Sequence, residues 1–124
     1  MFPPIFAIAA SSSDVTSLLG ANPVRFYLFG EATQQTAKPY AVWQIVTGHP
    51  GNTLSCRPDH DYITTQVDAY GTSASSARNV ARALRDAFEE SGECYITAWR
   101  GESKEASTNL FRVGFDVEWI IDRA

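Results

Sequence analysis

The residues best suited to chemistry lie in one polar stretch, residues 48–61. Cys56 precedes His60 by four positions, and Asp59 and Asp61 flank the histidine. A cysteine near a histidine can act as an activated nucleophile, and the same side chains can bind zinc. A structural zinc site, however, needs two such ligand pairs, and a nucleophile's base needs an orienting group. We therefore predict no catalytic, metal-binding or cofactor-binding residues here, and a small Cys56/His60 enzyme remains an alternative.

Charged side chains recur at regular spacing in two other segments. Asp116 and Glu118 are two apart, which places both on one face of a strand. Arg78, Arg82 and Arg85 follow helical spacing and share one side of a helix. Each set reads most simply as a solvated face opposite a core, but the arginines can also contact an acidic partner. The predicted interface residues are Arg57, Asp59, Asp61, Arg78, Arg82, Arg85, Asp116 and Glu118.

The bulk composition is that of one globular domain, residues 1–124. The chain has 124 residues, of which 44% are hydrophobic, enough for a single core. Its net charge of −4 argues against tight nucleic-acid binding. No phosphate loop or dinucleotide fingerprint is present, and no apolar run reaches the length of a membrane span.

The cysteine content and the start of the sequence indicate a cytosolic origin. Two cysteines in a chain of this size do not make a disulfide scaffold. We interpret Cys56 and Cys94 as free thiols in a reducing cytosol, although a single bridge stays open. The apolar residues 1–10 lack the positive charges that begin a signal peptide, so we expect none.

Periodicity predicts two helical regions and five strands. The prolines at positions 3 and 4 suit a helix start, and Ser11–Ser13 interrupts the apolar stripe, which leaves one bent helix or two short ones open. Ser13 is the predicted cap of the second stretch. The main helix starts after a cap at Thr72 or Ser73 and stops at Gly92. The predicted strands are 24–29, 40–47, 62–70, 94–99 and 110–121.

The order of these elements predicts an α+β fold. Hairpin-length links favour a mostly antiparallel sheet of about five strands, with two helices packed on one face, in the order α-β-β-β-α-β-β. Polar loops are expected over residues 30–38, 48–61 and 100–108. The stretch 48–61 is longer than a hairpin needs, and long ordered loops tend to carry function.

The ordered set of segments resembles one family. The segments that carry the resemblance span nearly the whole chain. They are Phe2-Pro3-Pro4-Ile5-Phe6, Val15…Leu18-Leu19-Gly20, Arg25-Phe26-Tyr27…Gly30-Glu31-Ala32, Pro39-Tyr40-Ala41-Val42-Trp43-Gln44, Tyr62…Gln66-Val67-Asp68-Ala69-Tyr70, Ser76-Ala77-Arg78…Ala83-Leu84-Arg85-Asp86-Ala87 and Phe111-Arg112…Phe115-Asp116-Val117-Glu118-Trp119. Together they resemble the tail terminator or tail completion (head-to-tail joining) proteins of tailed bacteriophages.

The resemblance implies a structural role in the virion. Such proteins cap the tail tube of a long-tailed phage as a hexameric ring, stop tube polymerisation and offer a surface to the head connector. The implied partners are further copies of the chain, the tail tube protein and the connector, with DNA passing through the lumen without specific binding. The implied location is the head-proximal end of the tail, and the host cytoplasm before assembly. Another neck or minor tail component, such as an adaptor, is the alternative.

Overall fold

A five-stranded sheet with three helices on one face makes up the part of the chain that the computed structural model describes, residues 2–33 and 35–123. Met1 and Ala124, the ends of the predicted domain, and Gln34, within the predicted loop 30–38, lie outside the described residues. The elements are α1 (Ile5–Ser11), α2 (Ser13–Leu19), β1 (Phe26–Leu28), β2 (Tyr40–Pro50), β3 (His60–Gly71), α3 (Ala74–Ser91), β4 (Cys94–Lys104) and β5 (Phe111–Asp122). The predicted α+β class is confirmed.

The N-terminal helical region is two short helices. Ser12 is extended between them, and its hydroxyl accepts a hydrogen bond from the Val15 amide at 3.3 Å. Ser12, rather than the predicted Ser13, therefore caps α2, because its extended backbone lets the side chain reach back over the first turn. Gly20 ends α2 with φ 83°, a conformation that glycine adopts without strain.

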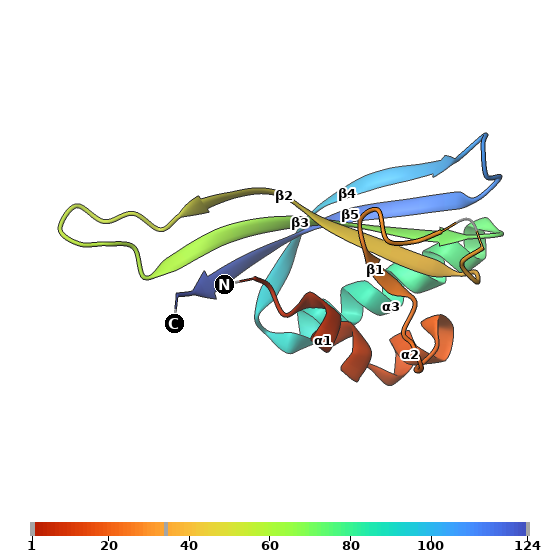
Figure 1. The fold of residues 1–124 in the computed structure, drawn as a ribbon, viewed down its shortest axis with the longest axis horizontal. Coiled ribbons are helices and arrows are strands. Elements are labelled where there is room, and N and C mark those ends of the chain that lie inside the picture. Colours follow the sequence, from red (N-terminus) through yellow and green to blue (C-terminus); the bar gives the residue numbers. More distant parts are fainter. Residues whose placement is uncertain (1, 34, 124) are drawn as a thin grey trace.

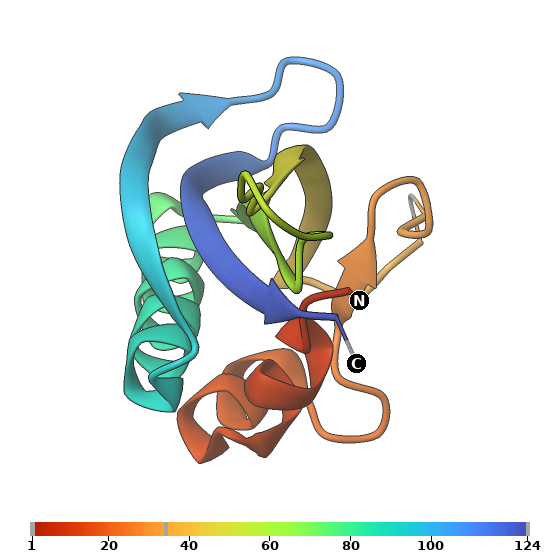
Figure 2. The ribbon, with the colours of Figure 1, turned by 90° about the vertical axis from the view of Figure 1, so that its left-hand side faces the viewer.

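The sheet has the strand order β1-β2-β3-β5-β4. β1 pairs with β2 in parallel, and every other neighbouring pair is antiparallel. β5, the last strand in the sequence, therefore lies between β3 and β4. The sheet is strongly curved, with the helices gathered on one side of it (Figure 2).

Two predicted loops are shorter than expected. The prediction of a loop over residues 48–61 is wrong at both ends, because β2 continues to Pro50 and β3 begins at His60. The Gly51 amide donates to the His60 carbonyl at 2.9 Å. Since amide directions alternate along an antiparallel strand, the nitrogen of Pro50 faces the free edge, where a missing donor costs nothing.

The prediction of a turn over residues 100–108 is also wrong at its start. β4 continues to Lys104 and pairs with β5 through two register shifts, the second of them around Gly101. Such bulges let a polar, glycine-containing segment remain a strand. β4 is consequently a long edge strand.

α3 is the longest helix and closes the core against the sheet. Ser73 caps it by accepting from the Ser76 amide at 3.1 Å, and Gly92 ends it in the left-handed conformation, both as predicted. The apolar stripe of α3 packs against the alternating inward residues of β3 and β5. The largest fully buried side chains are Trp119, Phe88, Phe115, Ile5, Leu19 and Leu84.

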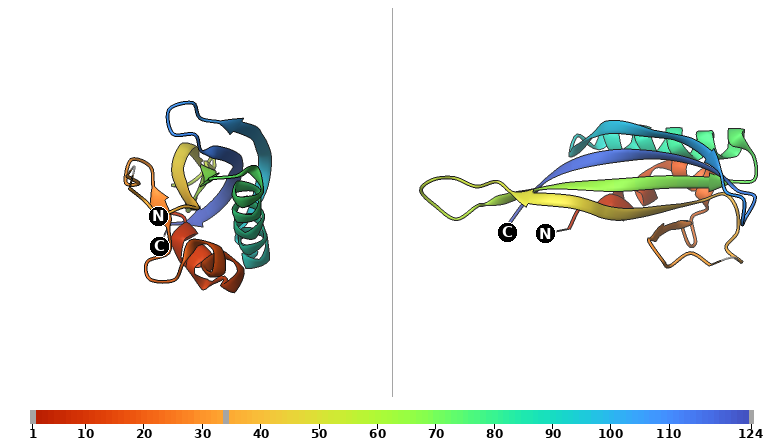
Figure 3. Two further views of the ribbon diagram at one scale, coloured as in Figure 1. Left: turned by 90° about the vertical axis from the view of Figure 1, so that its right-hand side faces the viewer. Right: turned by 90° about the horizontal axis from the view of Figure 1, so that it is seen from above.

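The β2–β3 hairpin extends beyond the body of the molecule (Figure 1, and Figure 3 from above). We call its outer part, residues 48–61, the arm. None of these residues, all of which are described, belongs to the hydrophobic core. The arm thus adds surface without adding to the interior.

Candidate functional site

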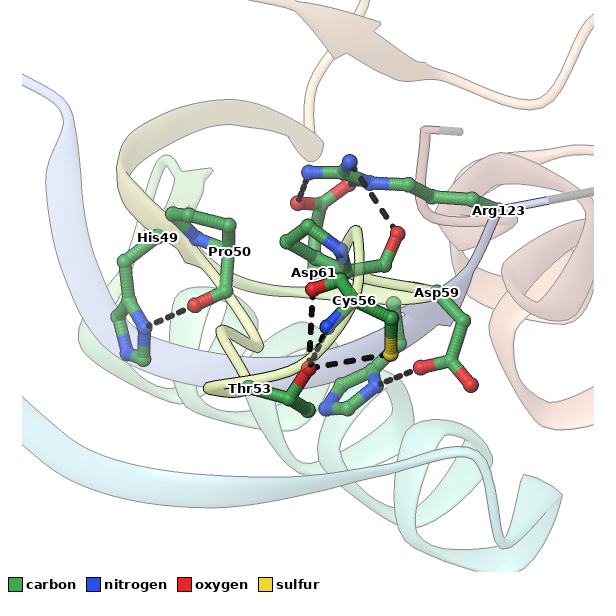
Figure 4. Close-up of polar contacts among 9 residues, drawn as sticks. His49, Pro50, Thr53, Cys56, Asp59, Asp61 and Arg123 are labelled. Atoms are coloured by element: carbon green, nitrogen blue, oxygen red, sulfur yellow. Dashed lines mark hydrogen bonds and ion pairs between the residues drawn. The ribbon is translucent and has the colours of Figure 1, made fainter.

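The arm is held at its base by one ion pair. Arg123, beyond the end of β5, reaches Asp61 with Nη2 2.6 Å from Oδ1 and Nε 3.0 Å from Oδ2 (Figure 4). The hydrogen bond from Arg123 holds the pKa of the Asp61 carboxyl below its ordinary value. The Arg123 amide also donates to the Asp59 carbonyl at 2.7 Å. These contacts tie the base of the arm to the end of β5.

The outer loop of the arm is ordered by its own side chains. The Thr53 hydroxyl donates to the Cys56 carbonyl at 2.9 Å and lies 3.2 Å from Cys56 Sγ (Figure 4). Leu54 is fully exposed, and Arg57 is exposed with no ion-pair partner in residues 2–33 and 35–123. Both side chains are therefore available to a partner at the outer end of the arm.

Cys56 and His60 do not form a catalytic pair in the described structure. The contacts of Cys56 Sγ are with Thr53, whereas His60 Nδ1 lies 2.7 Å from Asp59 Oδ1. The hydrogen bond and charge of His60 lower the pKa of the Asp59 carboxyl. Both cysteines are free, with Cys56 exposed and Cys94 half-buried.

The three predicted helix arginines have different surroundings. Arg78 forms an ion pair with Glu102 of β4, with Nη2 2.7 Å from Oε1. Arg85 pairs with Asp86 at 2.8 Å. Arg82 is exposed and has no ion-pair partner within the described chain. Of the three, Arg82 is the one left to bind something else.

The predicted acidic pair lies on the open face of the sheet, opposite the helices. Asp116 is only 6% exposed and binds Arg100, with Nη2 2.7 Å from Oδ2. Burial and the neighbouring Glu118 carboxylate raise the pKa of the Tyr95 hydroxyl. Asp116 is therefore already neutralised within its own chain, which reduces what it can offer to a neighbouring subunit.

A second ion pair crosses the open face beside the first. Arg112 Nη1 lies 2.7 Å from Asp68 Oδ1, and Gln66 donates to the other oxygen of Asp68 at 3.1 Å. A Cβ at Gly114 would lie 2.4 Å from Asp68 Oδ1, so the lack of a side chain there lets the pair span two strands. The open face is thus a network of paired charges.

Tyr70, at the end of this face, gives a pH prediction. Burial, the charges of Asp68 and Glu105 and the neighbouring Tyr40 raise its pKa to about 12. Tyrosine in an unfolded chain titrates near about 10, so the folded state holds this proton more tightly. The contribution of Tyr70 to stability is intact below about pH 10 and is lost as pH rises towards about 12. Melting temperatures across this range should fall less steeply for Tyr70→Phe, and identical slopes would contradict the assignment.

The described residues hold neither a group of metal ligands nor a helix able to span a membrane. Within 2–33 and 35–123, no three His, Cys, Asp or Glu side chains are grouped to hold a metal ion. None of the described helices is long and apolar enough to cross a bilayer.

Two grooves along α3 were not predicted from the sequence. One lies between α3 and β4 and contains the exposed Trp99, and the other lies between α3 and the α1–α2 corner. The exposed acidic residues Glu90 and Glu93 line the second groove. The charged residues of α3 were visible in the sequence, but the neighbouring elements that complete each groove were not.

Comparisons with known proteins agree with this architecture. A family model described as "Tail completion protein gp17" matches residues 3–122. Among solved structures, a chain from "Virion of native gene transfer agent (GTA) particle" is similar with a TM-score of 0.68 at 9% identity, covering 96% of this chain and 92% of that one. At this identity the likeness concerns the fold. Among curated protein sequences, none matches significantly.

Proposed function

The chain belongs to the tail completion protein gp17 family, and from this we propose that it caps the phage tail tube as a homohexameric ring, ends tube polymerisation and joins the tail to the head connector. Membership makes it a structural protein of the bacteriophage virion. The finer role gives it three protein partners: its own copies, the tail tube protein and the connector. It sits at the head-proximal end of the tail, and in the host cytoplasm before assembly.

The observation that carries this proposal is the arm, on a chain whose family match spans residues 3–122. The arm is ordered by internal hydrogen bonds, yet contributes nothing to the core. Leu54 and Arg57 at its outer end have no intramolecular role among the described residues. An ordered extension of this kind is suited to reach a neighbouring protein, and we assign it to the tube end.

The proposed activity is binding rather than catalysis. The separate contacts of Cys56 and His60 support this, since a nucleophile must lie within hydrogen-bond reach of its base. The net charge of −4 supports a lumen through which DNA passes without specific binding, because a protein that grips phosphates needs a basic surface.

Tube length in vitro tests the capping role. Purified tail tube protein polymerising with this protein should give tubes that stop growing and carry a ring at one end, seen by electron microscopy. Tubes formed without the protein are the control. Light scattering on the free protein should give the mass of six subunits if the ring forms alone. Tubes that lengthen equally in both samples, without a ring, would overturn the proposal.

A further inference from the structure

The charges on the exposed face of α3 are arranged against the helix macrodipole. Basic residues occupy its N-terminal two thirds, and the acidic residues follow towards the C-terminus. The macrodipole favours the opposite order, with acidic groups first and basic groups last. The first turn has no acidic residue and the last turn no basic residue. The macrodipole therefore does not account for this order, which suits a contact outside the helix.

The β4 flank of α3 carries a basic groove of about 280 Å³, lined by Arg78, Arg82, Arg85, Trp99, Glu102 and neighbouring small residues. Trp99 is 51% exposed, and the Arg85 guanidinium lies 6.0 Å from its ring centroid. Glu102 neutralises Arg78, whereas Arg82 has no ion-pair partner in the described chain. The groove therefore combines an exposed aromatic ring with an unneutralised positive charge, a combination common at protein interfaces.

The opposite flank of α3 carries an acidic groove of about 610 Å³, lined by the α1–α2 corner and the C-terminal end of the helix. Its charged residues are Asp14, Glu90 and Glu93, and none of the described residues that line it is lysine or arginine. The carboxylates of Glu90 and Glu93 have no ion-pair partner within 2–33 and 35–123. Figure 2 and the left view of Figure 3 show β4 and the α1–α2 corner on different sides of α3.

We propose that the basic groove of one copy binds the rim of the acidic groove of the next copy. The two grooves carry opposite charge and lie on different flanks, so their contact is head to tail and repeats around a closed ring. This inference rests on the proposed ring and assigns the residues at its subunit interface. It also assigns the partner of the helix arginines to Glu90 and Glu93, because Asp116 is occupied by Arg100 in its own chain.

Complementary charge reversals test the contact. Arg82→Glu and Glu90→Lys change exposed side chains without a described partner, so both variants should fold normally. Each alone places like charges at every interface and should raise the protein concentration for half-assembly at least about tenfold. Mixing the two variants should restore assembly as alternating rings, because each contact then pairs opposite charges. The double variant Arg82→Glu/Glu90→Lys should assemble alone for the same reason.

Assembly is followed by sedimentation of the free protein and by ring density on tube ends, so a ring that forms only on the tube is also detected. Glu31→Lys, the same charge change on the exposed loop after β1, is the matched control and should assemble normally. The interface is overturned if the wild type forms rings and both single variants form them equally well, or if mixing the two variants does not restore assembly. Either result leaves the ring function standing. Wild-type protein that forms no ring, free or on tubes, overturns both.

Discussion

Replacing Trp119 with alanine is expected to lower the free energy of unfolding by about 3–5 kcal/mol. Trp119 is fully buried and is the largest such side chain. Its ring packs edge to face on Phe88 with centroids 6.0 Å apart. Truncation removes this contact and leaves a cavity between the helix and the sheet. Urea unfolding followed by far-ultraviolet circular dichroism measures the loss, since that signal comes mainly from the backbone.

The indole hydrogen bond separates the polar part of this effect from the packing part. Trp119 Nε1–H donates to the buried Thr65 hydroxyl at 3.1 Å. Thr65→Val keeps the shape but leaves the indole N–H without an acceptor, at an expected cost of about 1–3 kcal/mol. Thr65→Ser, which keeps the oxygen, is the matched control. If Thr65→Val were as stable as the wild type, the hydrogen bond would not hold Trp119 in place.

Shortening the arm should abolish tube capping while leaving the domain folded. Gly51 and His60 already form a hydrogen-bonded pair, so a two-residue Asn-Gly turn can replace residues 52–59. The replaced residues make no core contact, and the melting temperature should stay close to that of the wild type. Tubes polymerised with this variant should grow as long as tubes polymerised from tail tube protein alone, measured by electron microscopy.

Two further variants make the arm experiment specific. Leu54→Ser and Arg57→Glu change exposed side chains at the outer end without shortening the arm. If the tube binds this end, both should weaken capping, with normal rings still forming through the α3 grooves. A shortened arm that caps tubes normally would show that the tube contacts another surface.

Strong periodicity made the core predictable from the sequence. The alternation from Phe111 to Ile121 places its aromatic and aliphatic residues towards the helices, as expected. The apolar stripe and both ends of α3 were also predicted, because a serine cap and a C-terminal glycine act locally. Local signals of this kind do not depend on distant parts of the chain.

The strand ends were not predictable, because they depend on which backbone edge is free. Pro50 and Gly101 read as turn residues, yet both lie within strands. Proline is tolerated in β2 where its nitrogen faces outward, and glycine in β4 where the register shifts. The parallel pairing of β1 with β2 was missed because a three-residue strand is too short for its pattern to indicate its direction.

The sequence predicted which charged residues line the candidate surfaces, but not which of them already have ion-pair partners within the chain. The sequence identified Arg78, Arg82 and Arg85 as one face, which the structure also gives them. It could not show that Glu102 pairs with the first of them. Nor could it show that Asp116 is buried against Arg100, since that pair depends on the register of β4 against β5. Ion pairs between side chains on different elements depend on the tertiary structure.

The position of β5 has a consequence for when the chain can fold. β5 is synthesised after β3 and β4, yet it lies between them and supplies Trp119 and Phe115 to the core. Until it leaves the ribosome, β3 and β4 lack their shared neighbour and α3 lacks much of its packing surface. Since pairing distant strands is slow, a nascent chain stays unable to present its grooves or its arm until translation has passed this strand. If the protein assembles as proposed, only completed chains would be able to join a ring.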